Sequence, residues 1–335
     1  MKHQITIKDI ALKLGFSIST VSRALSDHPD ISPKTKKAVK ELSDLLGYKP
    51  NQIALNLRNK STRTIGLIIP EIMHNYFSTI ISGVEEIAYN NDFNVFISQS
   101  NESYKREVIN TQSLLSNRVD GVLVSISKET KDLSHIKKLI SCKIPLVLFD
   151  RISDELNVDK VMSDDYHGAY IAVNHLIERG CKRIAIFSAP TNLSIGKNRY
   201  DGYKNALSDN NMPIDQNLFF PCDTFSDSRR IALSVLKKAE RPDGIFAVND
   251  RTAFGIMLSS KELGLKIPED IRVVGFENSF SAEITTPSLT SIDQFGYEIG
   301  REATKLLFKR IKNGYDGFLP EEKQIKTKLI IRNST

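Results

Sequence analysis

The feature that most limits the possible folds is a regular alternation of short apolar runs with stretches of helical periodicity, from residue 64 onward. The expected strands are Thr64–Ile69, Asn94–Ser98, Gly121–Ser125, Leu146–Phe149, Arg183–Phe187, Gly244–Val248 and Arg272–Gly275. The expected helices are 77–90, 104–117, 166–179, 197–210, 228–239, 250–264 and 295–313. This alternation predicts an α/β fold with parallel sheets covered by helices on both faces.

Two segments of this region echo one another. Asp120-Gly-Val-Leu-Val is matched by Asp243-Gly-Ile-Phe-Ala, about half of the region further on. A repeat of one strand pattern in two halves indicates two similar doubly wound lobes and not one oversized sheet.

The positive charge of the chain is concentrated at its N-terminus. Residues 1–63 contain 12 Lys and Arg against 5 Asp and Glu, which leaves 34 basic and 35 acidic residues in the remainder. A basic segment joined to a near-neutral body is typical of a module that binds a polyanion such as DNA.

The first 47 residues predict three short helices. Thr6 and Asp9 form a capping box before a helix over 6–13, and Ser17 can cap a second helix over 17–25. Gly15 supplies the turn between them, while Ser32-Pro33 starts a third helix that ends at Gly47. Two short helices joined by a glycine turn and braced by a third match the helix-turn-helix plan, although other three-helix bundles show similar stripes.

The exposed face of the second helix favours DNA binding over a plain bundle. Its residues between the buried positions are small, hydroxylated or cationic: Ile18, Ser19, Thr20, Ser22 and Arg23. Short side chains let a helix approach base edges in the major groove, and an arginine can pair with guanine.

The N-terminal region resembles that of the lactose-repressor (LacI/GalR) family of bacterial transcriptional regulators, in three segments that occur in order: ITIKDIALKLGFSISTVSRAL, SPKTKKAV and GYKPNQIALNLR. The resemblance implies that the second helix selects the operator sequence. It also implies that a hinge helix within 50–60 folds on DNA and wedges Leu57 into the minor groove, where packing of Leu57 on the core is the alternative. The family commonly has Arg where this chain has Leu55. The expected DNA contacts are Thr6, Ser17, Ile18, Ser19, Thr20, Ser22, Arg23, Asn51 and Leu57.

The resemblance also implies a core like a periplasmic binding protein, with two lobes linked by crossing strands. The expected domains are a helix-turn-helix headpiece over 1–49, a hinge and linker over 50–63, and an effector-binding and dimerisation core over 64–335. Within the core, the first lobe is expected at about 64–162 and 293–320, and the second at about 163–292 and 321–335.

Several polar residues directly follow predicted strands, where parallel sheets bind their ligands. Asp150, Arg151, Asn249, Asp250 and Glu277 hold such positions, although Asp250 could simply cap helix 250–264. The resemblance adds further residues at the effector site: Phe77, the pair Asp164-Asp165 at the entrance of the second lobe, Arg199, Phe225 and Gln294. Two departures from the family point to an atypical ligand such as an oligosaccharide or a sugar phosphate: Glu277 replaces the usual Asp, and Phe225 fits its position only with a shifted loop.

Other classes of protein find little support. The chain has no GxGxxG after a strand, no GxxxxGK[ST], no GxSxG and no HExxH, so an enzyme is not expected. Its three cysteines lack metal-site spacing, and we expect no cofactor and no metal. No apolar run is long enough to span a membrane, and the N-terminus has no signal region, so a cytoplasmic location is expected.

These observations predict a homodimeric, DNA-binding repressor of carbohydrate-utilisation genes, controlled by a small sugar-like effector bound between the lobes. One alternative is a regulator that responds to a purine or to a partner protein. A solute-binding protein for sugar transport is another, which the basic N-terminus disfavours.

Overall fold

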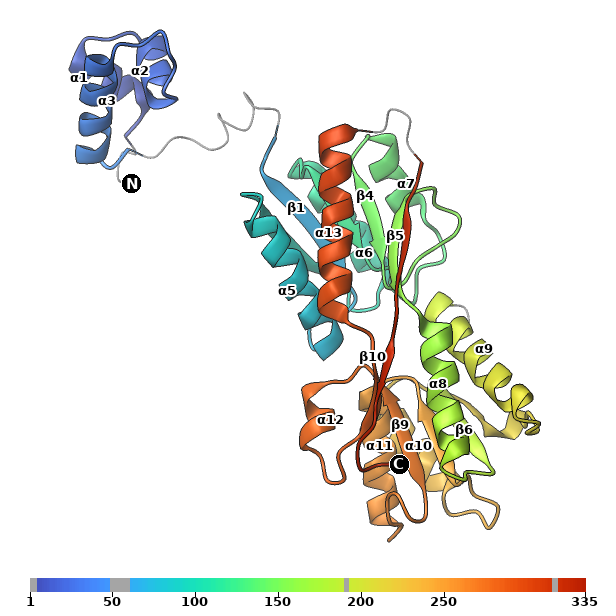
Figure 1. The fold of residues 1–335 in the computed structure, drawn as a ribbon. Helices are drawn as coiled ribbons and strands as arrows, with labels where there is room; N and C mark the ends of the chain where they lie inside the picture. The colour runs from blue at the N-terminus through green and yellow to red at the C-terminus, as the bar shows by residue number, and fades with distance from the viewer. Residues whose placement is uncertain (1–4, 49–60, 190–192, 315–318) are drawn as a thin grey trace. The chain divides into compact units, whose positions relative to one another are not determined.

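The chain divides between Thr62 and Arg63 into two units, which we call the headpiece and the core (Figure 1). The computed structural model describes residues 5–48, 61–189, 193–314 and 319–335. Within these ranges no helix combines the length and the apolar character that crossing a membrane requires.

The headpiece consists of three helices: α1 (Ile7–Leu14), α2 (Ile18–Leu25) and α3 (Pro33–Leu45). Gly15 ends α1 at φ 67°, a conformation that glycine adopts without strain. The hydroxyl groups of Ser17 and Ser32 cap the next two helices by accepting hydrogen bonds from backbone N–H groups three residues on. The helices pack around Ile10, Val21 and Val39, all with no exposed surface. The predicted helix-turn-helix is confirmed.

The first lobe of the core is built on a six-stranded parallel sheet in the order β11-β5-β4-β3-β1-β2. Its strands are β1 (Thr64–Ile69), β2 (Asn94–Gln99), β3 (Gly121–Val124), β4 (Leu146–Phe149), β5 (Asp159–Ser163) and β11 (Glu322–Ile325). Helices α5 (Asn75–Tyr89) and α13 (Gly296–Asn313) cover one face of the sheet, and α6 (Tyr104–Ser116) and α7 (Ser134–Ser141) cover the other.

The second lobe repeats this plan with the strand order β12-β10-β9-β8-β6-β7, in which only β12 runs antiparallel to its neighbour. Its strands are β6 (Ile184–Ser188), β7 (Phe219–Pro221), β8 (Gly244–Ala247), β9 (Arg272–Phe276), β10 (Thr290–Asp293) and β12 (Lys328–Ile330). Helices α8 (Asp165–Glu178) and α9 (Ser194–Asp209) cover one face, α10 (Phe225–Val235) and α11 (Asp250–Glu262) cover the other, and the short α12 (Phe280–Ile284) follows β9. The expected two-lobed α/β fold is therefore confirmed.

The chain crosses between the lobes three times: after β5, after β10 and between β11 and β12 (Figure 1). The last crossing corrects the predicted lobe boundary. Residues from 321 were expected in the second lobe, but Glu322–Ile325 pairs with β5 in the sheet of the first lobe. The segment is rich in charged residues and has no apolar run that identifies it as a strand.

Helices α5 and α13 approach each other closely because each carries a glycine at the contact. A Cβ atom on Gly83 would collide with the backbone oxygen of Tyr297, and one on Gly300 would collide with that of Ile80. The two backbones therefore touch, and we expect α5 and α13 to move as one body.

Candidate functional site

The second headpiece helix presents the face that its sequence predicts. Ile18 is 48% exposed, Ser19 and Arg23 are exposed, and Thr20 and Ser22 are half-buried, while Val21 and Ala24 point into the headpiece core. This face is free of bulky side chains around Ser19, which suits close approach to a groove.

Ser17 and Thr6 serve mainly to start helices. The hydroxyl of Ser17 accepts a hydrogen bond from the backbone N–H of Thr20 at 3.0 Å and is 2.8 Å from the hydroxyls of Ser19 and Thr20. The backbone N–H and the hydroxyl of Thr6 both donate to the carboxylate of Asp9, at 2.8 and 2.7 Å. Both residues lie at helix N-termini, where backbone N–H groups favour a phosphate.

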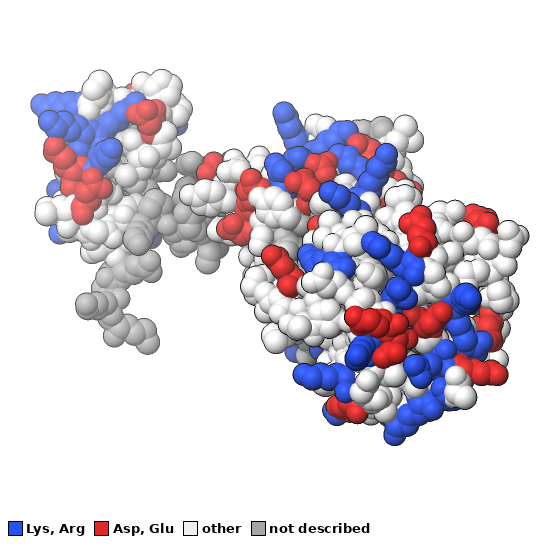
Figure 2. Space-filling model, turned by 60° about the horizontal axis from the view of Figure 1, so that its bottom comes forward, with Lys and Arg blue, Asp and Glu red and all other residues white. Residues whose placement is uncertain are grey.

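The cationic side chains of the headpiece lie on its surface beside acidic ones (Figure 2). Lys36 is bound to Asp27 at 2.8 Å, whereas Arg23 is 4.0 Å from Asp30 with 59% of its side chain exposed. An exposed pair at that distance contributes little free energy, so Arg23 can leave Asp30 for a DNA group at small cost.

Replacing Arg23 by alanine is expected to weaken operator binding by about 1–3 kcal/mol, or roughly 5- to 150-fold, and to relax preference at one base pair. Binding of variant operators, measured by anisotropy, tests this. A loss of equal size on every sequence would show instead that Arg23 contacts only phosphate. Asn51 and Leu57, the two expected hinge contacts, lie outside the described residues.

Between the lobes, a buried polar cluster is organised around Arg199 on α9. Each nitrogen of its guanidinium group already donates a hydrogen bond: Nε to Asp165 at 2.8 Å, Nη1 to the backbone oxygen of Val248 at 2.5 Å, and Nη2 to Gln294 at 3.0 Å. The guanidinium also lies 3.8 Å above the centre of the Phe276 ring. Arg199 is 4% exposed, so these contacts hold it in a single orientation.

The first lobe adds Asp150 and Tyr76 to this cluster. Asp150 follows β4 with φ 60° and accepts a hydrogen bond from Ser125 at 3.1 Å. The hydroxyl of Tyr76 is buried near the Asp150 carboxylate but has no well-formed hydrogen bond to any described residue. A buried hydroxyl without a partner is costly, and a ligand bound between the lobes can supply the missing one.

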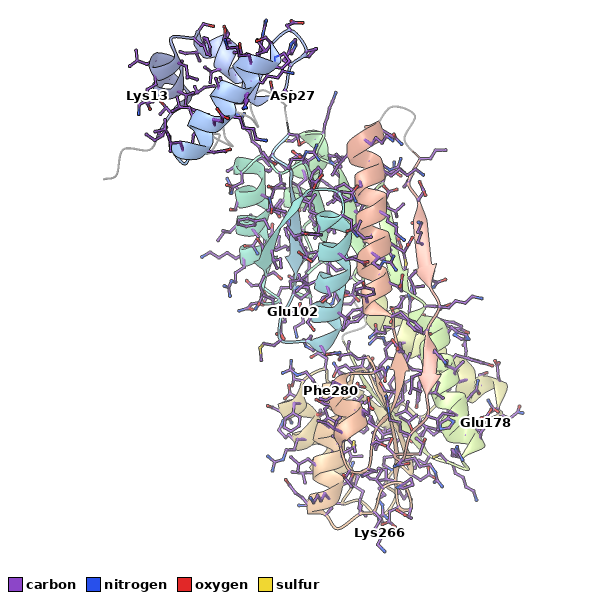
Figure 3. The ribbon with its side chains drawn as sticks, turned by 60° about the vertical axis from the view of Figure 1, so that its left-hand side comes forward. Lys13, Asp27, Glu102, Glu178, Lys266 and Phe280 are labelled. Atoms are coloured by element: carbon purple, nitrogen blue, oxygen red, sulfur yellow. The ribbon has the colours of Figure 1, made fainter. Side chains whose placement is uncertain are left out.

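Glu277, directly after β9, extends from the second lobe to the first. Its Oε1 accepts a hydrogen bond from the backbone N–H of Tyr76 at 2.9 Å. Two salt bridges also join the lobes: Lys128 to Asp223 at 3.4 Å and Arg251 to Glu71 at 3.5 Å. Glu102 lies at the end of the first lobe that faces the second (Figure 3).

Burial disfavours the charged forms of the acidic groups in the cluster. It raises the pKa of Asp150 to about 6 and raises the pKa of Asp165 as well. Burial, together with the neighbouring Asp250, raises the pKa of Glu277 to about 8. Burial raises the pKa of Tyr76 well above its usual value. Carboxyl and amide groups dominate the cluster around Arg199, and such groups pair well with the hydroxyl groups of a ligand.

Three predicted contacts make hydrogen bonds within the second lobe. Asp164 caps α8 by accepting from the backbone N–H of His167 at 3.0 Å. Asn249, and not Asp250, caps α11, with its Oδ1 2.8 Å from the backbone N–H of Thr252. Asp250 is fully buried, with its two oxygens bound to Ser279 and Ser291.

The three remaining predicted contacts differ in their surroundings. Arg151 is bound to Glu102 at 2.6 Å and lies 4.0 Å from Asp150. Phe77 is 4% exposed and packs in the core of the first lobe, against Tyr76 at a ring-centre distance of 5.5 Å. Phe225 is the half-buried first residue of α10. The structure thus brings together Asp150, Arg199, Glu277 and Gln294 from the predicted set.

One member of the cluster, Tyr76, was not among the predicted effector contacts. It adjoins Phe77, which was, and it lies in the first turn of α5. Asp164 and Asp165 were predicted as a pair, and the structure divides their roles: Asp164 caps α8, whereas Asp165 accepts a hydrogen bond from Arg199.

Comparison with known proteins gives matches along nearly the whole chain. Residues 6–51 match the model described as "Bacterial regulatory proteins, lacI family", and residues 62–333 match "Periplasmic binding proteins and sugar binding domain of LacI family". The catabolite control protein A of Priestia megaterium is 32% identical over 307 residues, covering 91% of this chain and 92% of that protein. The transcriptional repressor PurR of Vibrio atlanticus (strain LGP32) is 33% identical over 312 residues, with 92% of each chain covered.

Solved structures are similar as well. A transcriptional regulator CelR–cellobiose complex superposes with a TM-score of 0.75 at 28% identity, over 99% of this chain and 100% of that chain.

Proposed function

The chain belongs to the LacI family of bacterial regulatory proteins and is a DNA-binding transcriptional regulator, and from this premise we propose that it represses carbohydrate-utilisation genes under the control of a small uncharged sugar bound between its lobes. We further propose that the α2 face reads the operator and that Asp150, Tyr76, Arg199, Glu277 and Gln294 surround the effector.

The class of effector is inferred from the hydrogen bonds that Arg199 already makes within the protein. Its three nitrogens already donate to Asp165, Val248 and Gln294, so it offers little to a phosphate. The cluster around it consists instead of carboxyl and amide groups, which pair with sugar hydroxyls. An uncharged sugar therefore fits better than a sugar phosphate, although Lys128 joins the two lobes through its salt bridge to Asp223.

Relatives point to two ligand classes. The CelR complex contains cellobiose, whereas PurR is named for purine control. Among the described residues, the aromatic pair Tyr76 and Phe77 is the feature that a flat purine could use, but Phe77 is packed in the lobe core. We therefore rank a sugar first.

Isothermal titration calorimetry on the full chain tests this ranking, with panels of neutral mono- and disaccharides, their phosphate esters, and purines. A neutral sugar that binds while its phosphate ester does not is the expected result. The ranking would be contradicted if a purine bound and no sugar did, or if only a phosphate ester bound tightly.

We also propose that the chain acts as a homodimer, in the cytoplasm where operator DNA lies, and we assign it no catalytic reaction because its relatives are transcriptional regulators. Large apolar side chains support the dimer. Phe280 and Ile284 on α12 are 68% and 63% exposed, and Met73, which precedes α5, is 86% exposed. Helices α12 and α5 lie on the same side of the core (Figure 1). Such exposed apolar groups are typical of an interface.

The double substitution Phe280→Asp with Ile284→Asp is expected to convert the dimer to monomers and to weaken operator binding, because one headpiece then contacts only one half-site. Sedimentation velocity measures the first effect. Ile331→Asp is the control, because Ile331 is 55% exposed but directly follows β12, away from α12 and α5 in the sequence. A monomeric wild-type chain, or a dimer that survives the double substitution, would contradict the assigned surface.

A further inference from the structure

Helix α5 begins where the first lobe contacts the second, without a cap from its own segment. Its N-cap residue, His74, makes no side-chain capping bond, and its first turn contains no acidic residue. Helix N-termini carry unpaired N–H groups and a partial positive charge, which a carboxyl group can satisfy. In this part of the described chain the capping group comes from the other lobe: Glu277 accepts from the N–H of Tyr76 at 2.9 Å.

The segment that carries Glu277 is held firmly. Glu277 and Asn278 have φ values of 135° and 52°, conformations that cost energy for residues other than glycine. The loop keeps them because Asn278 is bound to Asp293 and Arg332, at 2.9 and 2.7 Å, and the next residue, Ser279, donates to Asp250. The carboxyl group is therefore aimed at α5 before the lobes meet.

The length of the Glu277 side chain is what allows the contact. An aspartate there would withdraw the carboxyl group by one methylene, about 1.5 Å. A donor–acceptor distance of 2.9 Å would then exceed 4 Å unless the lobes moved, which is no hydrogen bond.

We propose that Glu277 is an inter-lobe helix cap: its carboxyl group binds the N-terminus of α5 and holds the two lobes closed before any effector arrives. The second carboxyl oxygen has no hydrogen bond to a described residue and remains for the ligand. Since α5 and α13 are in backbone contact, the cap ties the second lobe to this whole helix pair. The proposal goes beyond the proposed function, because it concerns the ligand-free chain.

The distance between the lobes tests the cap directly, in the full-length chain without effector or DNA. One spin label is placed on the native exposed Cys142 of the first lobe and the other on Glu178→Cys of the second. The buried Cys181 and Cys222 stay unlabelled, because burial raises the pKa of each thiol to about 11. Pulsed electron paramagnetic resonance then gives the distance distribution.

Glu277→Asp is expected to shift and broaden the distribution, whereas Glu277→Gln is expected to keep it, because the amide oxygen still accepts from Tyr76. From the first lobe, Tyr76→Pro removes the donor at a helix position that tolerates proline, and is expected to act like Glu277→Asp. Tyr76→Ala is the matched control: it loses the buried ring as proline does but retains the backbone N–H, and it is expected to leave the distribution unchanged.

An unchanged distribution in both Glu277→Asp and Tyr76→Pro would overturn the proposal. The proposal would also be overturned if Glu277→Gln opened the lobes as far as Glu277→Asp does. In that case the charge of Glu277, and not its hydrogen bond to α5, would hold the lobes closed. Neither result bears on which effector binds, so a failure here is distinct from a failure of the proposed function.

Discussion

Replacing Arg199 by alanine is expected to abolish the response to effector and to destabilise the core by roughly 3–5 kcal/mol. Asp165 is 3% exposed and bound to Arg199 at 2.6 Å, so the substitution leaves a buried carboxylate without its cation. Gln294 and the backbone oxygen of Val248 lose hydrogen-bond donors in the same step. The lost ion pair and the lost hydrogen bonds lie where the lobes meet. The effector would therefore face a collapsed or hydrated space there.

Urea unfolding followed by circular dichroism measures the stability of the core, and calorimetry with the identified sugar measures binding. Arg179→Ala is the control, because Arg179 is an exposed arginine at the end of α8. Adding Asp165→Asn to Arg199→Ala should recover part of the stability but not the binding. If effector affinity or stability survives Arg199→Ala, the cluster is not the effector site as described.

The substitution Val21→Asp is expected to reduce operator affinity by roughly tenfold or more, while effector binding to the core stays unchanged. Val21 has no exposed surface and packs with Ile10 and Val39 in the small headpiece core. Burying a carboxylate there costs on the order of 4 kcal/mol or more. A unit of this size has roughly 3–5 kcal/mol of stability to lose, so the headpiece should unfold.

Anisotropy with operator DNA measures the first effect and calorimetry the second. Val21→Ala provides a graded comparison, because it removes packing without introducing charge and should weaken binding less. Loss of effector binding in Val21→Asp would contradict the division into two units. Undiminished operator affinity would show that the headpiece core is not what positions α2.

The sequence predicts the central strands well because their apolar runs are unbroken, as in Leu146–Phe149, which is buried throughout. It does not reveal β5, because Asp159 and Lys160 interrupt the pattern. Both are buried there: Asp159 is paired with Arg310 at 2.6 Å and Lys160 with Glu322 at 2.8 Å. Partners from the far end of the chain make a polar strand possible, and local sequence gives no sign of them.

The cluster between the lobes could likewise be predicted only in part. Residues that follow strands, such as Asp150 and Glu277, could be predicted because parallel strands end at one edge of the sheet. Residues at helix starts could not be placed to within one position, since the phase of a helix depends on where its cap forms. That single-residue uncertainty separates Phe77, which was predicted, from Tyr76, which lies in the cluster.

The most direct test of the central claim is operator binding on the DNA upstream of the gene, measured by fluorescence anisotropy with salt and neutral sugars varied. We predict tight, sequence-selective binding that falls by roughly 10³–10⁵-fold from about 50 to 200 mM salt, and a neutral sugar that changes it. Equal binding to all DNA sequences, or selective binding that no neutral sugar alters, would contradict the account.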